Sequence, residues 1–280
     1  MDRVELIEKL SVTEEAKEVL RKVNRVASSS NPLIKASIKN LFVTCPYGAA
    51  LSDYARVYEK IIVENAVYRV VGKGTYLELA FPKMGTEKDY ADFYNSTRIV
   101  AATINDYVGV FLVSFEQWSG YNELVREEAL SEFLKFVDCS KKNISFVFHV
   151  LPEFTDKEKL YFLLSGHVNL KKVELINPDL GKATDFIINE LKKTDITFTD
   201  SAKRKLGDFI SEKVDITSPH YLGYRTLERL SKNIIFEASC ILNEEQNGNK
   251  KIDVQMLEQL SVEVDFSLDE KDKKSRLGFM

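Results

Sequence analysis

Cysteine is scarce in this chain of 280 residues, and its pattern excludes two classes of scaffold. Cys45, Cys139 and Cys240 are odd in number and far apart, and no Cys-x-x-Cys pair occurs. Neither a zinc ribbon nor a disulfide framework is therefore indicated. We expect three reduced thiols, as in proteins of the cytosol.

Long apolar runs and clustered histidines are also missing. No run approaches the roughly 18 apolar residues that a membrane helix needs, and residues 1–9 are charged and contain no apolar signal-peptide core. The three histidines, His149, His167 and His220, are too dispersed for a metal-binding motif, and no Gly-x-Ser-x-Gly elbow is present. The sequence predicts a cytoplasmic protein without a membrane partner, a metal site or a serine-hydrolase site.

The charge balance gives no strong electrostatic preference. The formal net charge is −4, so the chain as a whole is not attracted to phosphates or anionic lipid. A nucleic-acid partner is therefore disfavoured. With 44% hydrophobic residues, the chain is long enough to form a sizeable core in one or two domains.

Hydrophobic patterning predicts an α/β region in the first part of the chain. Continuous apolar runs at 41–44, 108–113 and 144–150 are typical of buried strands, and residues 124–137 have helical spacing. Continuous rather than alternating strands, interleaved with helices, indicate a parallel sheet that is covered on both faces. Near the start, Ser11-Val-Thr-Glu14 fits a capping box in front of an amphipathic helix.

The composition changes at 177–181, Asn-Pro-Asp-Leu-Gly, and only helical patterns follow. Apolar stripes at 202–214, 227–242 and 254–260 predict a small helical domain. We therefore divide the chain into an α/β domain at 1–178, a helical domain at 179–262 and a flexible charged tail at 263–280.

Residues 45–56 carry a family resemblance. They read Cys-Pro-Tyr-Gly-Ala-Ala-Leu-Ser-Asp-Tyr-Ala-Arg, which resembles the phosphate loop Gly-Pro-Pro-Gly-Thr-Gly-Lys-Thr-Thr-Leu-Ala-Arg of AAA+ ATPases. The loop lies between a predicted strand and a predicted helix, as a P-loop must. Leu222-Gly-Tyr-Arg-Thr-Leu-Glu-Arg229 is similar to the red-type rubisco activase and stage V sporulation protein K group. The resemblance implies a P-loop NTPase (AAA+)-like parallel sheet sandwiched by helices, followed by a small all-helical lid domain.

The matched loop has lost most of the residues that bind phosphate. A P-loop needs glycines whose backbone N–H groups surround the phosphates, a lysine, and a hydroxyl for magnesium. Cys45 and Ala50 stand where the family has glycines, and Leu51 replaces the lysine. We expect Leu51 to pack inward as the first apolar residue of its helix. The candidate nucleotide-binding residues that remain are Gly48, Ser52 and, at the position of the lid's sensor arginine, Arg225.

The catalytic positions that the resemblance implies are degenerate as well. Ser114 and Phe115 occupy the place of the Asp-Glu pair of Walker B, and Glu116 lies one position too late. His149, at the sensor position, is expected to be a packed, hydrogen-bonded core residue. No arginine occurs between Arg126 and Arg204, so the arginine finger is missing and lysine replaces it poorly.

Together these substitutions predict a pseudo-ATPase with no catalytic residues and no cofactor, acting through contacts with another AAA+-type chain or with itself. The predicted contact surfaces are residues 45–52, Lys171-Lys172 and residues 221–229. A divergent nucleotide-dependent switch, with ATP and Mg²⁺ as its ligands, is the alternative. A clamp-loader-like subunit, a class whose assemblies include members with degraded sites, is a further one.

Overall fold

The computed structural model describes residues 2–68, 73–80, 91, 95, 107–116, 118, 123–216, 221–244 and 251–260. The chain forms two compact units. The first contains Met1–Pro46 and Ala50–Ile176, and the second contains Tyr47–Ala49 and Asn177–Met280. The predicted flexible tail, 263–280, lies outside the described residues. No helix of the described part is long and apolar enough to cross a membrane.

The first unit is built on a parallel sheet of five strands in the order β2-β3-β4-β1-β5. The strands are β1 (Asn40–Thr44), β2 (Lys73–Ala80), β3 (Tyr107–Ser114), β4 (Ile144–Val150) and β5 (Leu170–Glu174). All seven residues of the central strand β4 are buried. This explains its continuous apolar run, because a strand covered on both faces has no solvent side. The predicted parallel α/β sheet is confirmed.

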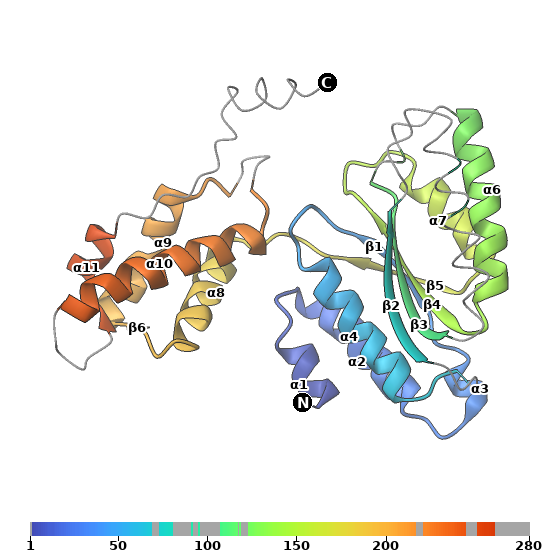
Figure 1. Ribbon diagram of the computed structural model, residues 1–280, viewed down its shortest axis with the longest axis horizontal. Helices are drawn as coiled ribbons and strands as arrows, with labels where there is room; N and C mark the ends of the chain where they lie inside the picture. Colours follow the sequence, from blue (N-terminus) through green and yellow to red (C-terminus); the bar gives the residue numbers. More distant parts are fainter. Residues whose placement is uncertain are drawn as a thin grey trace. The chain divides into compact units, whose positions relative to one another are not determined.

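Helices cover both faces of this sheet. Figure 1 shows α2 and α4 on one side, with α6 and α7 on the other. The helices of the first unit are α1 (Arg3–Glu8), α2 (Glu14–Ala27), α3 (Pro32–Lys35), α4 (Leu51–Glu64), α6 (Glu123–Ser140) and α7 (Lys157–Ser165). Thr13 caps α2 by accepting a hydrogen bond from the Ala16 N–H at 3.3 Å. The predicted capping box was therefore wrong about Ser11, because Glu14 is already the first helical residue.

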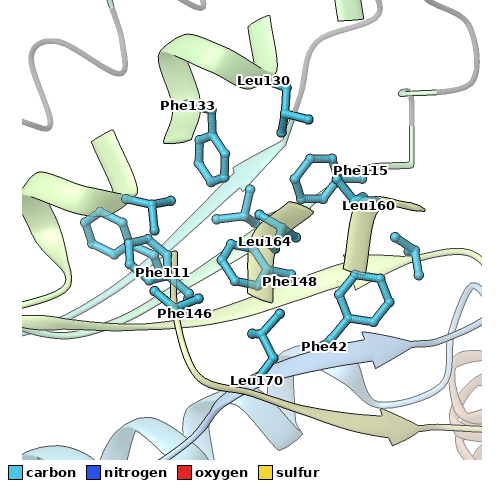
Figure 2. Close-up of a cluster of buried hydrophobic side chains, with 14 of the residues drawn as sticks. Phe42, Phe111, Phe115, Leu130, Phe133, Phe146, Phe148, Leu160, Leu164 and Leu170 are labelled. Carbon is cyan, nitrogen blue, oxygen red and sulfur yellow. The ribbon is translucent and has the colours of Figure 1, made fainter. Parts of the chain in front are cut away.

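Aromatic side chains form the core between the sheet and α6 (Figure 2). The rings of Phe146 and Phe148 stack with centroids 5.4 Å apart. Phe115 packs edge-on against Phe133 and Trp118, at centroid distances of 5.9 and 5.4 Å. Burial of each such side chain contributes about 1.5–3 kcal/mol of hydrophobic stabilisation. The ends of β3 and β4 are thus fixed against α6.

The second unit is mainly helical. Its helices are α8 (Leu180–Lys192), α9 (Asp200–Lys213), α10 (Tyr224–Glu244) and α11 (Val254–Gln259), which pack around a continuous apolar cluster. The last three match the predicted stripes. The unit also contains a parallel pair of two-residue strands, β6 (Thr197–Phe198) and β7 (Lys251–Ile252), which the prediction of an all-helical region omitted. Two residues are too few to produce a detectable alternation.

Both edge strands of the first unit also escaped prediction. β2 includes Gly74, and the sequence around it resembles a turn. β5 carries exposed Lys171, Lys172 and Glu174. Edge strands are often polar because they are only partly covered. Their signal is therefore weaker than that of the buried central strands.

Candidate functional site

The strand order creates a switch point at the carboxyl edge of the sheet. From β1 the chain continues to β2, beyond β4 and β3, whereas from β4 it continues to β5 on the other side of β1. The two connections therefore diverge between the carboxyl ends of β1 and β4. Parallel α/β sheets bind ligands at such points. Here the chain places Cys45 just after β1, His149 in β4 and Ser114 at the end of β3.

His149 links these three strands through both ring nitrogens. Its Nε2 lies 2.9 Å from the Cys45 carbonyl oxygen, and its Nδ1 lies 3.0 Å from the Ser114 hydroxyl oxygen. A carbonyl only accepts hydrogen bonds, so Nε2 carries the proton and Nδ1 accepts from Ser114. His149 is 2% exposed. The expectation of a packed, hydrogen-bonded histidine is confirmed.

Electrostatics keep this histidine neutral. Burial lowers the pKa of His149, while the bond to the Cys45 carbonyl and the charge of Glu116 oppose that shift. The Glu116 carboxylate Oε1 lies 3.5 Å from Nδ1, and its backbone N–H donates to the Ser114 hydroxyl at 3.4 Å. We call Cys45, Ser114, Glu116 and His149 the strand-end cluster. Its hydrogen bonds hold the ends of three strands together.

The strand-end cluster is not arranged for nucleophilic catalysis. In a Ser-His-Asp triad the histidine uses one nitrogen for the serine and the other for the carboxylate. Here Ser114 donates to Nδ1, the Glu116 carboxylate lies 3.5 Å from the same nitrogen, and the Cys45 carbonyl accepts from Nε2. Burial raises the pKa of the Cys45 thiol to about 12, so the thiolate nucleophile is disfavoured. Across the described ranges, no group of three His, Cys, Asp or Glu side chains could hold a metal ion.

Phe115 belongs to the core. It follows β3 directly, is 1% exposed and lies in the aromatic cluster with Phe133 and Phe148 (Figure 2). Glu116 is the nearest carboxylate in sequence and is only half-buried. A side chain at position 115 therefore points into packed apolar surroundings.

Packing within the second unit explains why position 48 is a glycine. Its φ is +82°, and a Cβ atom built on it would lie 1.7 Å from the Leu222 carbonyl oxygen. Residues 47–49 belong to the second unit, and this backbone contact lies within that unit. Only glycine combines this φ with so close a backbone approach. This contact is sufficient to explain the glycine at position 48, and phosphate binding is not needed as an explanation.

The start of α4 retains an unusual backbone. Ala50 has φ 40° and ψ 28°, a left-handed conformation, and its side chain forms no capping hydrogen bond. Leu51 begins the helix as expected but is half-buried, so it does not join the fully buried core. Ser52 is exposed on the first turn. A left-handed alanine costs roughly 1–2 kcal/mol relative to a right-handed one, a cost that glycine avoids.

Arg225 is the second residue of α10 and is exposed. Its backbone N–H donates to the Leu222 carbonyl, and its guanidinium forms no ion pair with any residue that the structure describes. Gly48 thus lies against the turn that precedes Arg225, whereas Ser52 belongs to the first unit.

Sequence reasoning missed Ser114 as the partner of His149. The sequence did contain one sign of this pair: Ser114 is a polar residue at the end of β3, and β3 pairs with β4, which carries His149.

Comparison with solved structures shows which known proteins share this fold. The Thermotoga maritima RuvB Holliday junction branch migration motor is similar, with TM-score 0.52, 15% identity and coverage of 94% of this chain and 74% of that chain. The FIGL-1 AAA domain is similar with TM-score 0.56, 11% identity and coverage of 96% and 87%. No protein-family model and no curated protein matches the sequence. Likeness at these identities concerns the fold alone, and that fold is the AAA+-type P-loop NTPase fold.

Proposed function

We propose that this chain is a non-hydrolysing AAA+-like subunit or adaptor that acts through protein contacts. The observation that supports this most is the strand-end cluster. At the switch point where a parallel α/β sheet binds its ligand, a buried neutral His149 bonds to Ser114 and to the Cys45 carbonyl. The bonded groups, the His149 ring, the Ser114 hydroxyl and the Cys45 carbonyl, are neutral, and the carboxylate of the cluster, Glu116, lies beside the histidine at 3.5 Å.

The residues around the cluster support the same proposal. Leu51 replaces the lysine that the AAA+ resemblance implies, and loss of one charge-assisted contact costs about 1.5–3 kcal/mol. Phe115 replaces an acidic residue and is buried in the core. Gly48 is explained by its contact with Leu222. The loop and the strand ends therefore serve packing.

The finer parts of the proposal come from the sequence. The resemblance to the red-type rubisco activase and stage V sporulation protein K group remains a prediction from the sequence. We expect a cytoplasmic protein whose partner is another AAA+-type chain or a second copy of itself. A subunit that gains no stabilisation from a nucleotide at its interface must rely on direct side-chain and backbone contacts.

Calorimetric titration of the full chain with ATP and Mg²⁺ tests this function. We expect no binding tighter than about 1 mM, corresponding to about −4.1 kcal/mol, and no phosphate release above a protein-free control. A low-micromolar dissociation constant would contradict the proposal.

A nucleotide-dependent switch is the second candidate, favoured by the start of α4. Ala50 is left-handed, and Ser52 places an exposed hydroxyl beside Tyr76 on the first turn of the helix. If ATP and Mg²⁺ bind there, Ser52→Ala should weaken binding by about tenfold, since a hydrogen bond to a charged group contributes about 1.5–3 kcal/mol. Ser131→Ala is the matched control, because Ser131 is also an exposed helical serine.

A further inference from the structure

An open groove runs between α2 and β5 in the first unit. It encloses about 1000 Å³, and among its lining residues are four consecutive residues of β5, 171–174. Successive side chains of a strand point to opposite faces, so a wall formed by consecutive residues is the edge of the strand. We call this space the β5 groove.

The backbone edge of β5 faces this groove without a partner strand. β5 is the last strand in the sheet order and pairs only with β1 within the described residues. Such an edge presents N–H and C=O groups that can accept an additional strand. On the opposite wall, α2 provides apolar Val19, Val23 and Val26, and Ile176 beyond the end of β5 is 46% exposed. The groove thus combines a free backbone edge with an apolar wall.

The charges differ between the two walls. The α2 wall carries Glu14, Glu15 and Glu18 together with Lys22 and with Arg21, which bonds to Glu14 at 2.5 Å and to Glu8. The strand side is lined by Lys39, Lys171 and Lys172, all exposed, with Glu174 at its far end.

Lys172 marks the face of β5 opposite α2. It bonds to Glu158 of α7 at 2.6 Å and lies over the ring of Tyr161 at 4.3 Å. Since residues alternate along the strand, Lys171 and Val173 face α2. A strand added here would meet the valines of α2 and Lys171 on one face and Lys172 on the other.

The sequence contains a segment with the complementary pattern. Residues 261–269 read Ser-Val-Glu-Val-Asp-Phe-Ser-Leu-Asp, and they lie outside the described residues. Val262, Val264, Phe266 and Leu268 alternate with polar or acidic residues, which is the period of a half-buried strand. One face of such a strand would be apolar and the other acidic, matching α2 and Lys172 respectively.

We propose that residues 261–269 of a second copy add to β5 as a sixth strand. Backbone hydrogen bonds to the free edge supply affinity, and the alternate side chains supply specificity. The apolar residues pack on the valines of α2, and Glu263 and Asp265 approach Lys172. The proposal goes beyond the proposed function, because the β5 groove and this segment lie apart from the strand-end cluster.

Light scattering of the full chain over a range of concentrations tests the inference. We expect concentration-dependent association, and we expect Phe266→Asp to weaken it at least tenfold, because the variant removes the aromatic side chain that the proposal places against the valines of α2. Phe279→Asp is the matched control, since it makes the same change outside residues 261–269 and should leave association unchanged. A chain that is monomeric throughout, or a Phe266→Asp variant that associates normally, would overturn the proposal.

Charge reversal tests the register independently. Lys172→Glu should weaken association about fivefold, the effect of one exposed ion pair near the upper end of its range. Asp265→Lys in the same chain should restore it. A synthetic peptide of residues 261–269 should dissociate the assembly, and a scrambled peptide should not. Failure of the rescue together with failure of the peptide would overturn the proposal, whereas ATP binding would contradict only the proposed function.

Discussion

The carboxyl edge of the sheet and the edge of β5 differ in how far they are closed. At the carboxyl edge, Cys45 and His149 are 1% and 2% exposed, and the polar groups of the histidine ring are hydrogen-bonded to the chain itself. Along β5, backbone groups and exposed lysines border a groove of about 1000 Å³. The strand ends at the switch point are hydrogen-bonded to one another, whereas the edge of β5 borders an open groove. Function depends on such local differences and not on the fold alone.

The strongest test of the closed region is Phe115→Ala. Phe115 is buried among aromatic rings, so its truncation should lower the free energy of unfolding by about 3–5 kcal/mol. Urea denaturation measures this loss. Lys171→Ala in the open groove is the control and should change stability by less than about 0.5 kcal/mol. Equal effects at the two positions would remove the distinction between the regions.

Gly48→Ala tests the packing of the loop. The φ of +82° and the approach of the Leu222 carbonyl both oppose a side chain, so we expect a loss of at least about 2 kcal/mol. Gly207→Ala is the matched control, because a Cβ there would lie 3.9 Å from the Thr184 hydroxyl, an ordinary contact inside α9. That variant should gain roughly 0.5–1 kcal/mol. If Gly48→Ala is as stable as wild type in thermal unfolding, the loop does not pack against Leu222.

The neutral state of His149 predicts a pH dependence. Because its folded pKa is lowered, the unfolded chain binds a proton first as the pH falls below the ordinary value of 6.5. Stability should therefore decrease from about pH 6.5 down to the lowered folded pKa, by at most about 1.4 kcal/mol per pH unit. His149→Gln should remove this contribution, so its unfolding free energy should vary less steeply with pH. If the unfolding free energies of the two proteins vary with pH in parallel, His149 is protonated as easily in the folded chain as in the unfolded chain.

Ala50→Gly should have the smallest effect, and it should be stabilising. Ala50 has a left-handed backbone that glycine adopts freely, so the variant should gain about 0.5–1 kcal/mol of unfolding free energy. Chemical denaturation of both proteins measures the gain. A loss of stability would indicate that the loop is not left-handed at this position in solution.

The sequence was most informative where burial is complete. β4 carries seven consecutive buried residues, and its apolar run predicted the strand with its observed bounds. β5 was missed because Lys171, Lys172 and Glu174 conceal the pattern of a strand that is covered only in part. At the candidate site, local sequence predicted a packed His149 but not its partners, since Cys45 and Ser114 are distant in the chain and meet only through strand pairing.

Leu51 shows a different limit. Its apolar character predicted inward packing, yet it is half-buried, because the first turn of a helix is covered only by what the preceding loop provides. The sequence also did not predict the left-handed conformation of Ala50. Alanine gives no local signal for a positive φ, in contrast to glycine.

The two lysines of β5 have a consequence for colloidal behaviour. An unpaired strand edge invites indiscriminate pairing with other edges, a route to aggregation. When two β5 edges approach each other, Lys171 and Lys172 of both copies come together, and like charges opposite one another are unfavourable. An acidic strand meets no such repulsion. The two lysines therefore oppose pairing between two β5 edges, and they favour an acidic strand over a basic one.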